Sequence, residues 1–182
     1  MKSLPLKEFK PTILFLLKFV GIYLVANVLY GIYVTAYSPG PDPITRIVSQ
    51  QTAIALGVCG WPSTTKDDER KPTTQLIYNG RSVLAIYEGC NGINIMIIFV
   101  AFLVAFGPIN KRLWIFTLAG ILIIHLMNLV RISVLFWVVL YLPDFTYFMH
   151  KYFFTAILFV IVFVLWIVWV RRFSHLKEIQ TE

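Results

Sequence analysis

Residues 113–142 constrain the fold most, because Arg131 is the only lysine, arginine, aspartate or glutamate among them. A helix of this length would extend roughly 45 Å, whereas the hydrocarbon core of a bilayer is roughly 30 Å thick. The whole chain of 182 residues is 58% hydrophobic and only 14% charged, which leaves too little polar surface for an ordinary soluble domain. The sequence therefore predicts an integral membrane protein with one long helix that extends beyond the lipid.

Three further apolar runs accompany this one. The first is longer than the hydrophobic region of a typical signal peptide and lacks a convincing cleavage site, so we interpret it as a retained helix. The second barely crosses the hydrocarbon core unless it includes the glycine-rich turn that precedes it. The expected fold is an all-α polytopic membrane protein, a single domain over residues 1–182, with about four transmembrane helices at 12–37, 91–107, 113–135 and 152–170.

The charges indicate the orientation of these helices. The net charge of +7 raises the possibility of nucleic-acid binding, but the basic residues flank the apolar runs instead of forming a stripe with interleaved aromatics. We therefore expect the lipid bilayer, and no nucleic acid, as a partner. Cytoplasmic N- and C-termini would place three basic segments on the cytoplasmic side, with Lys2, Lys7, Lys10, Lys111, Arg112, Arg171, Arg172 and Lys177.

The predicted exterior segment, residues 38–90, contains a surface helix and a β-hairpin. Apolar residues recur at helical spacing over residues 44–58, as in a helix that lies on a bilayer surface. Two β-prone runs, 75–78 and 82–87, are joined at Asn79-Gly80, where both turn residues accept positive φ. The hairpin leads directly to Glu88, Gly89 and Cys90 at the start of the next span.

Three reactive side chains are expected to meet at the exterior face of the membrane. Cys90 precedes the second span, and His150 precedes the last one. Arg131 lies roughly 28 Å along its helix from the cytoplasmic boundary at Arg112, which places it at the same depth. An imidazole can take the proton of a thiol, and a guanidinium can stabilise negative charge on an attacked carbonyl, so this set suits acyl transfer.

Four neighbouring residues are predicted to support these three. Gly89 and Gly92 would allow a sharp backbone turn and the close approach of a peptide. Asn128 lies one helical turn before Arg131, where it could orient Arg131 or His150 by hydrogen bonding. Glu88 could tune the site, although a solvated carboxylate at the end of a hairpin is the simpler interpretation. No metal or cofactor is expected.

Several alternatives stay open on these residues. Cys59 and Cys90 could form a disulfide, as in a thiol oxidoreductase, and Arg131 could simply snorkel from a helix end. His125 is a second candidate for the histidine, although it would lie about 9 Å deeper than Arg131. A membrane scaffold or assembly factor without catalysis would leave the three reactive side chains pointing apart. Tyr87 and the nearby tryptophans are most simply packing or interfacial residues.

Three segments together resemble the exosortase/archaeosortase family: residues 88–93 (EGCNGI), residues 128–132 (NLVRI) and His150 before the final span. The short chain is most similar to the compact form called exosortase F. Asn91 departs from the serine that many members have after the cysteine. The resemblance spans the C-terminal hundred residues.

This resemblance implies a function and a location. Members are polytopic cysteine transpeptidases, so the similarity implies Cys90 as nucleophile, with Arg131 and His150 as its partners. Their substrates are exported proteins with a C-terminal sorting signal, made of a short motif, a transmembrane helix and a basic cluster. A bacterial inner-membrane protein with its active site on the periplasmic side is therefore expected.

Overall fold

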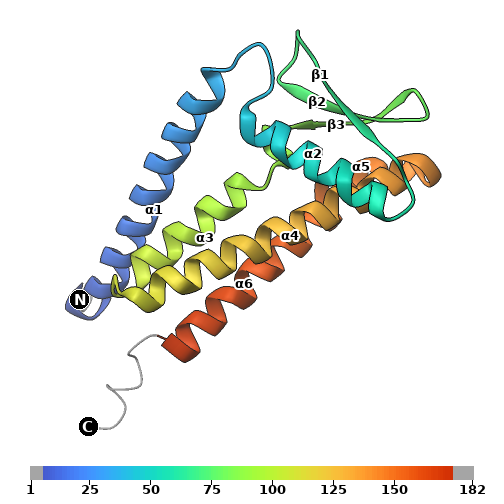
Figure 1. The fold of residues 1–182 in the computed structure, drawn as a ribbon. Helices are drawn as coiled ribbons and strands as arrows, with labels where there is room; N and C mark the ends of the chain where they lie inside the picture. Colours follow the sequence, from blue (N-terminus) through green and yellow to red (C-terminus); the bar gives the residue numbers. More distant parts are fainter. Residues whose placement is uncertain (1–5, 174–182) are drawn as a thin grey trace.

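Four helices form the body of the protein, and a small sheet with one further helix covers one end (Figure 1). The computed structural model describes residues 6–173. The four helices of the body are α1 (Leu6–Thr35), α3 (Ile93–Phe106), α4 (Lys111–Tyr141) and α6 (Phe154–Phe173). The start of α1, the α3–α4 connection and the end of α6 lie at the end of the molecule away from the sheet.

Three helical segments are long and apolar enough to cross a membrane: Phe9–Thr35, Lys111–Tyr141 and Pro143–Arg172. The predicted span at 91–107 corresponds to α3, an apolar helix of 14 residues, which extends only roughly 21 Å. The polytopic helical fold predicted from the sequence is confirmed, with three full-length candidate spans and one shorter apolar helix.

The sheet has three antiparallel strands, β1 (Thr64–Asp67), β2 (Thr73–Tyr78) and β3 (Arg81–Tyr87), in the order β1-β2-β3. The predicted hairpin is β2–β3, and its turn residues Asn79 and Gly80 have φ of 50° and 74°. Strand β1 was not predicted from the sequence. Its sequence, TTKD, is largely exposed and lacks the apolar alternation that marks a strand.

Helix α2 (Pro43–Val58) lies beneath the sheet and packs on α4. It begins at Asp42, whose carboxylate accepts hydrogen bonds from the amides of Ile44 (2.9 Å) and Thr45 (3.0 Å). The helix predicted at 44–58 is thus present, and several of its apolar residues, Ile47, Ile54 and Val58, are exposed. Hydroxyl residues supply half of its buried face, which consists of Thr45, Val48, Ser49, Thr52, Ala53 and Leu56.

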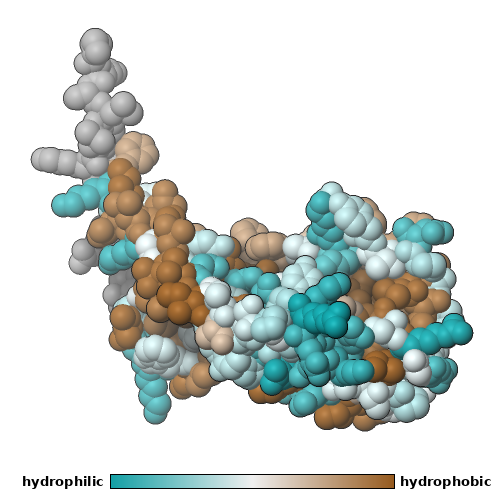
Figure 2. Space-filling view, turned by 90° about the horizontal axis from the view of Figure 1, so that it is seen from above, coloured by the Kyte–Doolittle hydropathy of each residue, from teal (hydrophilic) through white to brown (hydrophobic). Residues whose placement is uncertain are grey.

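Two apolar clusters hold the protein together. The first lies between α2, the sheet and α4, and the second joins α3, α4 and α6 around Phe99 and Trp169. Gly120 of α4 allows the close approach of α3, because a Cβ atom at this position would overlap the Phe99 ring. Seen from the sheet end, hydrophilic residues gather over the middle of the molecule and hydrophobic ones along α1 (Figure 2).

Candidate active site

A tight turn carries Cys90 from the sheet into α3. Strand β3 ends at Tyr87, a 3₁₀ turn (Glu88–Cys90) follows, and α3 begins after Gly92. Gly92 has a φ of 87°, and a Cβ atom there would lie 3.2 Å from the Asn128 amide group. Both the left-handed backbone and the closeness of Asn128 therefore favour glycine at this position.

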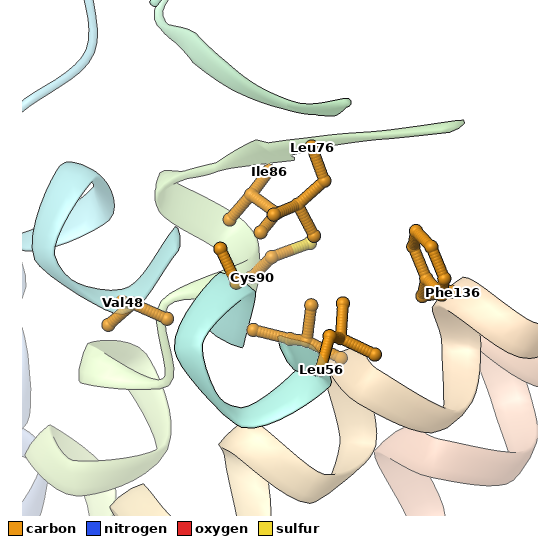
Figure 3. Packing of buried hydrophobic residues seen from close by; sticks show 8 residues of the cluster. Val48, Leu56, Leu76, Ile86, Cys90 and Phe136 are labelled. Atoms are coloured by element: carbon orange, nitrogen blue, oxygen red, sulfur yellow. The ribbon is translucent and has the colours of Figure 1, made fainter. Parts of the chain in front are cut away.

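Cys90 and His150 form a pair across this turn. The Cys90 sulfur lies 3.2 Å from Nε2 of His150, which is within hydrogen-bonding range for sulfur. His150 belongs to a single π-helical turn, Met149–Phe153, just before α6. Only 5% of Cys90 is exposed, and apolar side chains surround its inner side: Val48, Leu56, Leu76, Ile86 and Phe136 (Figure 3).

Asn128 connects the turn to Arg131. Its amide nitrogen donates a hydrogen bond to the Cys90 carbonyl (2.9 Å), and its amide oxygen accepts one from Nη1 of Arg131 (3.3 Å). Asn128 is fully buried, so this pair of bonds satisfies groups that water does not reach. From the sequence, Asn128 was expected to orient Arg131 or His150. It contacts Arg131 and, in addition, the backbone of the nucleophile candidate itself.

The Arg131 guanidinium carries a charge without an acidic partner. The residue is 9% exposed, and its Nε has no hydrogen-bond partner within the described residues. Over residues 6–173, no carboxylate oxygen lies within 4.0 Å of it. Since buried charges are usually paired, the guanidinium is available to an anionic group that enters the site.

Burial sets the protonation of the thiol. Desolvation raises the pKa of Cys90 above its ordinary value, while the Arg131 charge and the neighbouring Tyr87 oppose this rise. Glu88 adds to the rise by charge repulsion. The raised pKa favours a neutral thiol beside the imidazole at neutral pH.

A pocket of about 360 Å³ opens beside the Cys90–His150 pair. It lies between the β3 end, α4 and the segment that leads into α6. Its walls contain two cationic side chains and no carboxylate, and they are formed by Tyr87, Gly89, Arg131, Tyr147, His150, Lys151 and Thr155. Of the Cys90–His150 pair, His150 is the member that lines this pocket.

The structure argues against the alternatives that the sequence left open for these residues. His125 bonds through Nε2 to Oε1 of Gln51 on α2 (2.8 Å), so its imidazole connects two helices and is engaged away from Cys90. Cys59 and Cys90 are both free; Cys59 is exposed at the end of α2, so the disulfide alternative is wrong for this structure. The scaffold alternative expected three diverging side chains, whereas two of them are in contact and Asn128 links the third.

Glu88 and Gly89 lie beside the pair. One carboxylate oxygen of Glu88 is buried and has no hydrogen-bond partner among residues 6–173, so this carboxylate is not simply solvated. A Cβ atom on Gly89 would overlap the ring of Tyr87. The predicted role of Gly89 in a sharp turn thus has a more specific basis, which is the position of a neighbouring aromatic ring.

Asn91 is a structural residue that the sequence analysis did not select. It is fully buried; its amide nitrogen donates to the Tyr30 hydroxyl (2.7 Å) and to Oγ1 of Thr45 (3.1 Å). Its amide oxygen accepts from the Ile93 amide (3.0 Å) at the start of α3. Asn91 therefore joins α1, α2 and α3 directly behind Cys90. A serine would be too short to make all three contacts, which gives the departure at this position a physical reason.

Comparison with known proteins gives one match. The profile of the transmembrane exosortase family matches residues 9–168, which include every element described above except the ends of α1 and α6. Comparisons with curated protein sequences and with solved structures gave no match. The matched region covers most of the 182 residues and contains the whole Cys90 site. The chain therefore belongs to the transmembrane exosortase family.

Proposed function

We propose that this protein is a membrane-embedded cysteine transpeptidase that cleaves the C-terminal sorting signal of exported proteins. The observation that carries the proposal is the distance of 3.2 Å between the Cys90 sulfur and Nε2 of His150, with a guanidinium in the same pocket. A thiol, a base and a fixed cation are the groups that attack on a peptide carbonyl requires.

The reaction begins with proton transfer from the Cys90 thiol to Nε2 of His150. The thiolate attacks the scissile carbonyl carbon, and negative charge develops on the carbonyl oxygen, where Arg131 stabilises it. The C–N bond then breaks, His150 returns the proton to the leaving amine, and a thioester on Cys90 remains. An amine or another nucleophile attacks this thioester and regenerates the thiol.

Asn128 positions both partners of this reaction. It donates to the Cys90 carbonyl and accepts from Arg131, so the nucleophile turn and the guanidinium share one rigid connection. A misplacement of about 1 Å at a catalytic group can lower the rate about a hundredfold. We therefore assign Asn128 a positioning role and Gly92 the role of admitting it to the turn.

We place the site on the periplasmic side of a bacterial inner membrane. Lys111, Arg112, Arg171 and Arg172 lie on α4 and α6 at the end of the molecule away from the sheet. The positive-inside rule makes this end cytoplasmic, together with both termini. The sheet, α2 and Cys90 are then exterior, where the sorting signal of an exported protein would emerge from its own transmembrane helix.

Co-expression with an exported protein that carries a C-terminal sorting signal tests the proposal. Mass spectrometry should find the tail removed with the native enzyme and retained with Cys90→Ala. Cys59→Ala is the matched control, because Cys59 is exposed and lies outside the site, and it should leave processing intact. Removal of the tail by Cys90→Ala would exclude the cysteine mechanism.

A second pair of variants tests the choice of histidine. His150→Ala removes the only imidazole found in contact with the Cys90 sulfur in the described part of the chain, so we expect processing to fall at least a hundredfold. His125→Ala breaks only the bond to Gln51 and should retain most activity. A larger loss of processing in His125→Ala than in His150→Ala would assign the base to His125.

A further inference from the structure

We propose that Tyr87 is a further catalytic residue, whose phenol donates a hydrogen bond to the Cys90 sulfur, and that Gly89 is required because it leaves room for the Tyr87 ring. The inference rests on the proposed function in assigning a reaction to Cys90. The sequence alone gave Tyr87 only a packing or interfacial role.

The position of Tyr87 supports this assignment. It is the last residue of β3, three residues before Cys90, and the 3₁₀ turn between them brings the chain back beneath its ring. The ring forms part of the pocket wall with Arg131 and His150, and its centroid lies 6.5 Å from that of the His150 ring. The Tyr87 side chain thus lines the same pocket as the imidazole that contacts the Cys90 sulfur.

Gly89 makes this position possible. An added Cβ atom would overlap the edge of the Tyr87 ring near Cε2 and would lie 3.0 Å from Cζ, the atom that bears the hydroxyl. Gly89 does not have a left-handed backbone, so alanine is compatible with the main chain. The ring is 39% exposed and can swing outward. Alanine at position 89 would therefore displace the phenol and leave the turn itself intact.

The charges around Cys90 explain what the phenol contributes. Arg131 favours the thiolate, Glu88 disfavours it, and His150 exchanges the proton, so a bond from the Tyr87 phenol would act in the same direction as Arg131. Lys151 adds a second cation to the pocket wall. The proximity of Cys90 raises the pKa of the Tyr87 phenol, which stays protonated and serves as a donor at neutral pH.

The phenol keeps its proton through the reaction. When His150 takes the thiol proton, the Tyr87 O–H stabilises the sulfur anion. As the sulfur–carbon bond forms, the negative charge moves to the carbonyl oxygen near Arg131. The proton held by His150 goes to the leaving amine, and the hydrogen bond from Tyr87 is needed again when the thioester is resolved and the thiolate leaves.

The pH dependence of Cys90 alkylation by iodoacetamide tests the hydrogen bond. A Cys59→Ser background leaves Cys90 as the only cysteine. Tyr87→Phe keeps the ring and removes the donor, so the pH midpoint of alkylation should rise, and the rate at neutral pH should fall about tenfold. Tyr152→Phe removes a phenol outside the pocket wall and should leave the midpoint unchanged. An unchanged midpoint in Tyr87→Phe would exclude the hydrogen bond.

Gly89→Ala tests the second half of the proposal. It should raise the alkylation midpoint as Tyr87→Phe does, and the double variant should show no further rise, because both changes remove the same bond. Additive shifts would contradict a shared cause. Circular dichroism of each variant in detergent monitors folding.

The alkylation assay uses no substrate, so its result is independent of the proposed peptide cleavage. A raised midpoint in Tyr87→Phe together with tail removal by Cys90→Ala would preserve the hydrogen bond and exclude the proposed function. If tail removal depends on Cys90 but the midpoint is unchanged in Tyr87→Phe, the proposed function stands and the hydrogen bond is excluded.

Discussion

The sheet end and the helical body of this protein are held together in different ways. At the sheet end, buried polar side chains bond across segments: Asn91 reaches α1 and α2, and Asn128 reaches the Cys90 turn. In the body, the contacts are apolar, with Phe99 against Gly120 and Trp166 stacked on Phe102 at a centroid distance of 4.2 Å.

This contrast separates two tasks. Apolar contacts in the body tolerate small shifts, because they are non-directional and a lipid can replace a protein neighbour at their edge. Hydrogen bonds at the sheet end fix distances and angles, which is what a reaction between a sulfur, an imidazole and a carbonyl needs. The protein thus places its directional bonds where the proposed chemistry occurs.

The largest expected effect is that of Asn128→Leu at the boundary between the two regions. The variant leaves the Cys90 carbonyl and the Arg131 guanidinium without their partner, which should lower the free energy of unfolding by about 3 kcal/mol. We expect a lower melting temperature in detergent and loss of substrate processing. Asn27→Leu is the matched control, because the Asn27 side chain bonds to the Tyr23 carbonyl within the same helix, α1. Equal effects of both variants would contradict the assigned role of Asn128.

Gly120→Ala should affect the body alone, with a smaller loss of about 2 kcal/mol, because its Cβ atom would push into the buried Phe99 ring. Gly21→Ala is the matched control on α1, where a Cβ atom would meet nothing within 4 Å. Thermal unfolding measures the difference. The midpoint of Cys90 alkylation should not move in either variant, and a shift in Gly120→Ala would show that the two regions are coupled.

The smallest expected effect is that of Tyr30→Phe, which removes one of the three hydrogen bonds of Asn91. The free energy of unfolding should fall by about 1 kcal/mol, because the hydrogen bonds to Thr45 and Ile93 still hold Asn91. Tyr23→Phe, whose phenol makes no hydrogen bond that the structure records over residues 6–173, should be neutral. A loss above about 3 kcal/mol in Tyr30→Phe would mean that α1 depends on this single contact.

The sequence predicted what depends on hydrophobic periodicity and turn chemistry. Long apolar runs marked α1, α4 and α6, and Asn79-Gly80 marked the β2–β3 turn. It did not predict β1, because a short exposed strand depends on pairing with β2 instead of on its own residues.

The site was predictable only in part, because sequence patterns give positions along a helix but not contacts between helices. Helical rise placed Cys90, Arg131 and His150 at one depth, but depth does not determine which side chains touch. The bonds of Asn91 with Tyr30 and Thr45 connect residues far apart in the chain. Only the folded structure shows that Tyr30 and Thr45 are the partners of Asn91. The role that we propose for Tyr87 was not expected from the sequence, because an aromatic residue near a membrane face usually has an interfacial role.

Helix α4 has a consequence that concerns the surrounding lipid. This single element of 31 residues crosses the body and also bears Asn128 and Arg131 at the site. Its length of roughly 46 Å exceeds the hydrocarbon thickness, and such a helix adjusts to thicker or thinner bilayers by tilting. Because Asn128 ties the Cys90 turn to α4, a change of tilt moves the thiol and the guanidinium together relative to the lipid surface. Acyl-chain length is therefore a variable to which the proposed processing activity should respond.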